Sequence, residues 1–107
     1  MEQLPTDDVL HRFLLERAGV RGALVRLGPA WREIAGRAGY PLPVRDLLGE
    51  ALAASALMTA HIKLDGELSV QLKSDGDLRL LFAECSDRGR LRGIARWHDP
   101  VPASLAL

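Results

Sequence analysis

The chain has 107 residues, with 14 Lys+Arg against 14 Asp+Glu, so its formal net charge is zero. This length fits a single domain, and a hydrophobic content of 48% supports a buried core. The charge balance argues against a general polyanion binder, because such proteins carry a basic excess. The single cysteine excludes an internal disulfide and a multi-thiolate metal site, and it favours a reducing, cytoplasmic location. We expect no signal peptide, and the most apolar stretch, residues 51–60, is too short to span a membrane.

The first third of the chain predicts two strands and a helix. Val9–Leu15 fits the period of a strand and of a helix equally well, so its local pattern leaves the choice open. After Gly19, Val20–Leu27 is rich in β-branched and apolar residues and predicts a strand. Pro29 then begins a helix that we expect to stop near Gly39. Its apolar stripe consists of Trp31, Ile34, Ala35 and Ala38.

A longer helix is predicted from Pro43 to about Ile62. From Ala51 onward it is apolar nearly all round, which indicates cover on more than one side. The residues expected near one face are Val44, Leu47, Leu48, Ala51, Ser55, Met58 and Ile62.

The remaining sequence predicts a three-strand meander. Glu67–Lys73 alternates cleanly, and we expect the next strand to continue its inward face with Leu78, Leu80 and Phe82. Leu91–Trp97 is the third strand. The predicted fold class is therefore α+β: a mainly antiparallel sheet, made of an N-terminal strand pair and this meander, with two helices packed on one face.

Catalytic and metal-binding patterns are weak. The histidines His11, His61 and His98 are too far apart in sequence to form a local metal motif, and ordinary imidazoles are the favoured interpretation. Cys85 precedes Arg88, which is a condition for a reactive thiolate, but a small apolar residue at a strand end is the simpler interpretation. The sequence has no Gly-rich phosphate loop and no Gly-x-Ser-x-Gly motif. We therefore expect no enzyme.

One basic cluster offers an alternative function, a small RNA- or anion-binding module. Its residues are Arg88, Arg90, Arg92 and Arg96. The competing interpretation is a solvated sheet face whose cations pair with Asp75, Asp77 or Glu67. This second interpretation is favoured, because only 5% of the residues are aromatic and single-stranded RNA is usually bound by aromatic stacking.

Taken in order, several segments resemble the N-terminal part of the heat-shock protein 33 family, redox-regulated holdase chaperones also called 33 kDa chaperonins. The resemblance covers residues 7–97 and favours a strand for residues 9–15. The matching segments are residues 8–15 (DVLHRFLL), 20–22 (VRG), 40–44 (YPLPV), 47–54 (LLGEALAA), 62–68 (IKLDGEL), 70–72 (VQL), 75–78 (DGDL) and 91–96 (LRGIAR).

The resemblance implies an ATP-independent chaperone that holds unfolding proteins under oxidative and heat stress. In this family a C-terminal module binds zinc through four cysteines arranged as Cys-x-Cys and Cys-x-x-Cys. Oxidation of these cysteines releases zinc, and a neighbouring linker then unfolds because the metal no longer stabilises the fold. Exposed apolar surface captures client proteins, and dimerisation strengthens the capture.

The chain departs from the family pattern because it contains neither cysteine motif. We therefore expect residues 1–107 to be a single, incomplete N-terminal core domain that lacks the linker and the zinc module and binds no cofactor itself. Cys85 matches none of the four redox cysteines and receives no switch role. The expected partners are unfolded clients and a second copy of the chain in a homo-oligomer (dimer), with no membrane and no nucleic acid. Leu81 is the candidate client contact, because it falls opposite Leu80 and Phe82 on its strand; a packed layer over that face is the alternative.

Overall fold

The structure, a computed structural model, describes residues 8–62 and 65–103. Its elements follow one another as β1 (Val9–Leu15), β2 (Val20–Arg26), α1 (Pro29–Ala35), α2 (Leu42–His61), β3 (Glu67–Lys73), β4 (Leu78–Ser86) and β5 (Leu91–Trp97). The strands form two antiparallel sheets, β1-β2 and β3-β4-β5. The predicted α+β class is confirmed, and so is the strand at residues 9–15.

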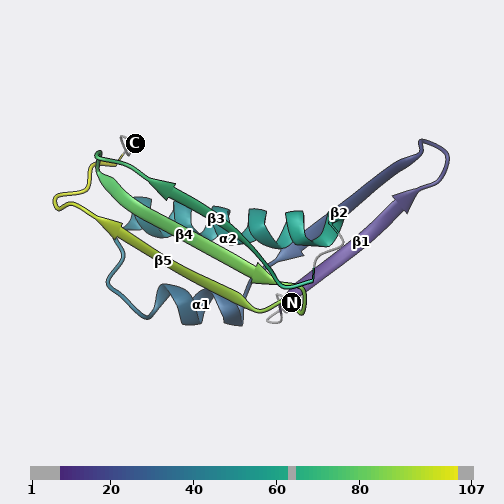
Figure 1. Cartoon of the computed structure of the whole chain (residues 1–107), viewed down its shortest axis with the longest axis horizontal. Helices are drawn as coiled ribbons and strands as arrows, with labels where there is room; N and C mark the ends of the chain where they lie inside the picture. Colours follow the sequence, from purple (N-terminus) through teal and green to yellow (C-terminus); the bar gives the residue numbers. More distant parts are fainter. Residues whose placement is uncertain (1–7, 63–64, 104–107) are drawn as a thin grey trace, which may run out of the picture.

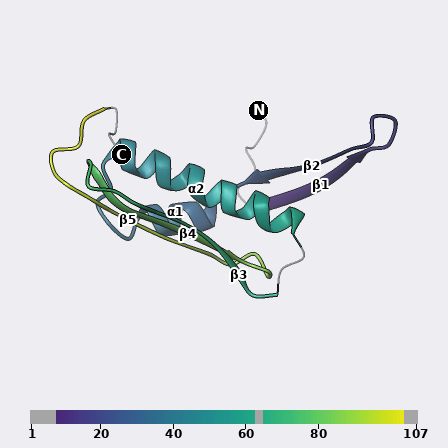
Figure 2. The same ribbon diagram turned by 45° about the horizontal axis from the view of Figure 1, so that its top comes forward.

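Helix α2 is the element that joins the two sheets (Figures 1 and 2). It lies along one face of β3-β4-β5, and it also contacts both strands of the β1-β2 hairpin. Helix α1 packs beside it against β5, on the same side of the sheet. In Figure 2 the hairpin projects beyond the C-terminal end of α2, away from the three-stranded sheet.

The core lies between α2 and the three-stranded sheet. Leu48 and Leu52 are completely buried, and both meet Gly93 on β5. A Cβ atom at Gly93 would lie 3.1 Å from Leu52 Cδ2 and 3.3 Å from Leu48 Cδ1, so glycine permits this close approach. The buried core cluster is completed by Ile34, Val44, Leu78, Leu81, Ala83 and Ala95.

The inward face of β4 differs from the prediction. An irregularity in the pairing with β5 between Leu78 and Leu80 shifts the phase of the strand, as a β-bulge does. Leu78 and Leu81 are therefore both buried against the helix layer, while Leu80 and Phe82 lie on the opposite, open face. The prediction that Leu80 and Phe82 point inward is wrong. It assumes that side chains alternate strictly along the strand, whereas the extra residue at the bulge reverses the two faces after Leu78.

The helices are close to their predicted positions. Helix α2 begins one residue before the predicted start at Pro43 and ends at His61. Helix α1 is shorter than predicted, because it ends at Ala35 with Gly36 as its C-cap instead of continuing toward Gly39. Met58 and Ile62, which were expected near the same helix face as Val44 and Leu48, are exposed.

Truncating Leu52 tests the contact between α2 and the sheet. Leu52→Ala leaves a cavity beside Gly93, so we expect the free energy of unfolding in urea to fall by about 2–5 kcal/mol. Met58→Ala is the matched control, because it removes side-chain atoms from the same helix at a position that is 40% exposed. It should cost less than half as much. Equal losses for the two variants would contradict the packing of Leu52 against Gly93.

Candidate functional site

Two charged side chains fix the base of the β1-β2 hairpin to the ends of the two helices. The Asp8 carboxylate accepts hydrogen bonds from the backbone N–H of Gly28 (2.7 Å) and of Ala30 (3.1 Å), at the start of α1. The Arg12 Nε–H donates to the carbonyl oxygen of Ala60 (2.9 Å), in the last turn of α2. A carboxylate at a helix N-terminus and a guanidinium at a helix C-terminus both oppose the helix dipole favourably. The hairpin is thereby anchored at its base.

The hairpin carries most of the large hydrophobic residues that are exposed among the described residues. Six of the ten large hydrophobic residues found exposed there belong to it: Leu10, Phe13, Leu14, Leu15, Val20 and Leu24. Strand pairing places four of these six on one face, where each is about half exposed (46–54%): Phe13, Leu15, Val20 and Leu24. We call these four residues the outer face of the hairpin.

A glycine shapes the middle of the outer face. Phe13 is paired with Gly22 across the two strands, and the Phe13 ring lies over the glycine. A Cβ atom at position 22 would collide with this ring. The aromatic side chain therefore lies across both strands of the hairpin, on the same face as the exposed His11, which is paired with Leu24.

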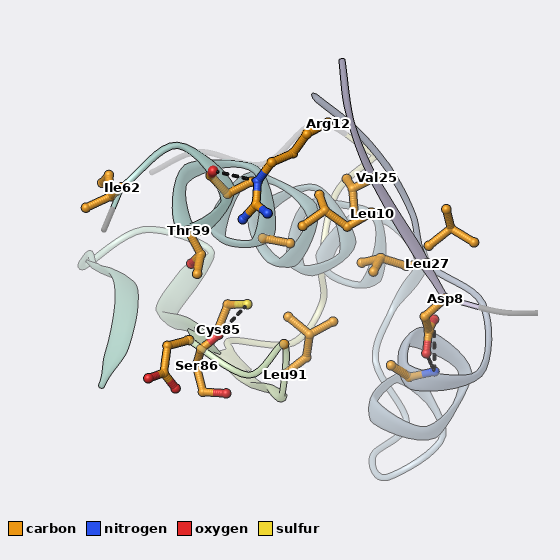
Figure 3. A pocket seen from close by; sticks show the side chains of 16 residues that line it. Asp8, Leu10, Arg12, Val25, Leu27, Thr59, Ile62, Cys85, Ser86 and Leu91 are labelled. Carbon is orange, nitrogen blue, oxygen red and sulfur yellow. Dashed lines mark hydrogen bonds between the residues drawn. The ribbon is translucent and has the colours of Figure 1, made fainter. Parts of the chain in front are cut away.

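The other face of the hairpin closes a groove of about 460 Å³ against the body of the protein (Figure 3). Leu10 and Val25 line it from the hairpin, Thr59 from α2, and Cys85 and Leu91 from the sheet. Figure 3 shows the Arg12 side chain reaching across this groove to α2. The groove separates the hairpin from the sheet, so the hairpin touches the rest of the fold mainly through α2.

Cys85 is buried in the wall of this groove, with 3% of its surface exposed. Its thiol donates a hydrogen bond to the carbonyl oxygen of Ser86 (3.4 Å). Cys85 is paired with Leu68 and Leu91 on the neighbouring strands, in an apolar setting. This environment supports the interpretation of Cys85 as a small apolar residue at a strand end.

Leu81 is also buried. It is 4% exposed and belongs to the core cluster beneath α2. The predicted exposure of Leu81 is wrong, and the alternative of a packed layer over its face is what the structure shows.

The three histidines belong to separate elements, β1, α2 and the segment after β5, and all three are exposed. Within residues 8–62 and 65–103, no group of three or more His, Cys, Asp or Glu side chains is placed to hold a metal ion. Ser55 is buried, and its hydroxyl donates to the Leu52 carbonyl within α2 (2.8 Å).

The predicted arginine cluster is divided between the two ends of β5. Arg88 and Arg90 lie in the turn before β5, where their backbone N–H groups donate to Ser86 Oγ. Arg92 pairs with Glu84 at 3.6 Å, an acidic partner that was not among those predicted. Arg96 lies at the far end, in a hollow with Lys73 and Arg79. Lys73 and Arg79 were not among the predicted cluster, because only the strand register brings them to Arg96.

Comparison with known proteins agrees with this fold and with its distribution of residues. The family model described as "Hsp33 protein" matches residues 8–106. The chain belongs to the Hsp33 family. Among its relatives, the 33 kDa chaperonin of Photobacterium profundum is 44% identical over 97 residues, which cover 91% of this chain and 33% of that protein. The 33 kDa chaperonin of Nitrosococcus oceani is 46% identical over 95 residues, or 89% of this chain and 33% of the relative.

The chain therefore spans about a third of the length of the Hsp33 proteins that it matches. The resemblance first seen in short segments is confirmed as family membership. No helix among the described residues is both long and apolar enough to cross a membrane.

Replacing Arg12 tests how the hairpin is anchored. Arg12→Gln removes the charged donor to the Ala60 carbonyl, so we expect faster amide hydrogen exchange in β1 and β2 and a loss of about 0.5–1.5 kcal/mol in the free energy of unfolding. Arg17→Gln makes the same charge change in the exposed turn between the two strands and should leave exchange unaltered. If both variants accelerate exchange equally, the net charge, and not the hydrogen bond from Arg12 to Ala60, determines the stability of the hairpin.

Proposed function

We propose that this chain supplies a client-holding surface of an Hsp33-type chaperone, ATP-independent and redox-regulated in its full form, and that the outer face of the hairpin is that surface. The observation that carries the proposal is the concentration of exposed apolar side chains on one projecting element. Family membership supports the chaperone class, which does not include enzymes.

The physical chemistry of the outer face suits clients of many sequences. Unfolding proteins expose apolar segments, and burying these segments contributes roughly 25 cal/mol for each Å² removed from water. This attraction is non-directional, so it requires no particular client sequence. A holdase that binds in this way needs no nucleotide, because binding itself keeps the client from aggregating.

Leu81, the client contact predicted from the sequence, is not accessible to a client in the folded structure. Since its side chain lies beneath α2, it meets a client only after α2 separates from the sheet. The outer face is accessible without any such change, and it is therefore the better candidate.

Zinc binding and oxidant sensing are proposed to lie outside these 107 residues. A four-cysteine zinc module requires four thiolates, and this chain has one cysteine, which is buried. We propose that the chain acts as one N-terminal core domain and that its clients are cytoplasmic proteins, in keeping with the single free thiol.

A dimer is also proposed. Each strand of the two-stranded sheet has one edge unpaired within the described residues, and exposed edges readily pair with a second chain. Light scattering across micromolar concentrations tests this proposal, and a stable monomer throughout that range contradicts it.

The holding surface is tested by aggregation of a heat-denatured client. Phe13→Ser together with Leu24→Ser removes large apolar groups from the outer face without touching the core, so we expect suppression of client light scattering to fall severalfold. Leu42→Ser is the matched control, because Leu42 is 65% exposed and lies at the far end of α2 from the hairpin.

Retention of full activity by the double hairpin variant would place the holding surface elsewhere. Loss of activity in Leu42→Ser to the same degree would indicate that total apolar exposure matters and the hairpin does not. Circular dichroism and urea unfolding of each variant establish that the fold is intact.

Peroxide treatment tests whether oxidant sensing lies outside these 107 residues. Because Cys85 is buried and lacks a second cysteine, we expect peroxide to leave client holding by this chain unchanged. Cys85→Ser should behave in the same way. The assignment fails if peroxide switches holding on and Cys85→Ser abolishes that response.

A further inference from the structure

The open face of the three-stranded sheet carries a cationic hollow that the chaperone proposal does not use. It has a volume of about 520 Å³ and is lined by Lys73, Ser74, Asp75, Arg79, Leu80 and Arg96. Three strands or their ends contribute its charged groups, so the hollow exists only in the folded protein.

Strand register explains why these cations meet. Lys73 is paired with Leu80, and Leu80 is paired in turn with Arg96, so the three residues form one row across the sheet. Neighbouring strands lie about 4.8 Å apart, which places the backbones of Lys73 and Arg96 about 10 Å apart on either side of Leu80. Long flexible side chains at that spacing can reach one common ligand. Arg79, at the bulge of β4, adds a third cation.

Among the residues that the structure describes, no acidic side chain forms an ion pair with the cations of the hollow. Across residues 8–62 and 65–103, the ion pairs are Arg37 with Glu33 and Arg92 with Glu84, and neither involves the hollow. Asp75 supplies one carboxylate to the lining against three cations. Like charges gathered in this way repel one another, and an anion bound between them would relieve the repulsion.

Two further features of the lining suit an oxyanion. Ser74 Oγ accepts a hydrogen bond from the backbone N–H of Gly76 (2.9 Å), which leaves its hydroxyl hydrogen free for a ligand. The backbone N–H of Ser74 donates to the Arg79 carbonyl (3.1 Å), so the loop that frames the hollow is held in place.

We propose that this hollow binds a phosphate group, with Arg79 and Arg96 as fork-shaped donors and Lys73 as a point charge. Guanidinium groups match the oxygen geometry of phosphate, and an ammonium group complements its charge. The phosphate belongs either to a free anion such as pyrophosphate or to a single-stranded RNA, and the same three cations would bind it in both cases.

Isothermal titration of the whole chain with pyrophosphate, inorganic phosphate and a short single-stranded RNA tests the proposal. We expect saturable binding that Arg96→Gln weakens by about tenfold, the change expected from losing one charged hydrogen bond. Arg90→Gln is the matched control, because it removes the same charge at the opposite end of the sheet. Asp75→Asn should tighten binding, since it removes the carboxylate from the lining.

Each outcome decides the matter. Tighter binding of pyrophosphate than of RNA assigns the site to free anions, and the reverse order assigns it to RNA. Either result supports a phosphate site if Arg96→Gln weakens the binding and Arg90→Gln does not. Equal weakening by the two variants would show a net-charge effect and overturn the proposal. Absence of saturable binding for every probe up to about 10 mM, the range of a weak exposed site, would also overturn it. None of these outcomes bears on client holding, which is measured separately.

Discussion

The packing of helix α2 against β5 is the contact on which the rest of this structure depends. Leu48 and Leu52 are fully buried where they meet Gly93, and a Cβ atom there would crowd both side chains, at 3.3 Å and 3.1 Å. A second glycine, Gly49, admits the Trp31 ring, whose nearest atom would lie 3.2 Å from a Cβ at that position. These two glycines bring α1, α2 and the sheet close enough to form one core. A small two-layer domain buries a smaller fraction of its surface than a larger protein does, so this close approach contributes a larger share of its stability.

The dimensions of α2 then determine where the hairpin lies. A helix of 20 residues is about 30 Å long, and α2 contacts both sheets along its length. Its last turns lie against the hairpin, where Arg12 donates to the Ala60 carbonyl. Asp8 and Arg12 attach the hairpin to the two helix ends, where backbone N–H and carbonyl groups lack helical partners. The result is a projecting element with an anchored base and an apolar outer face. The same two-layer arrangement leaves one face of the three-stranded sheet uncovered, and the cationic hollow lies there.

Local sequence patterns predicted an element correctly where its bounds depend only on nearby residues. Strands β3 and β5 were predicted with the bounds that they have, because turn residues and alternation define both. Proline correctly marked the start of both helices. The pattern failed at β4, where the bulge near Arg79 reverses the faces and places Leu81 in the core instead of at the surface. The pattern did not distinguish strand from helix at Val9–Leu15, where pairing with β2 decides in favour of the strand.

By itself the sequence determined the fold class, the Hsp33 family and the absence of a four-cysteine zinc site, because each of these follows from the order and type of residues. Tertiary structure alone decided which apolar residues are exposed and which charges meet. Exposure depends on what covers a side chain, so Phe13 is open to solvent while Leu81, of similar apolar character, is not. Likewise, Lys73 and Arg96 are neighbours only through the strand between them. Both candidate sites depend on contacts between residues distant in sequence, and such contacts exist only once the chain has folded.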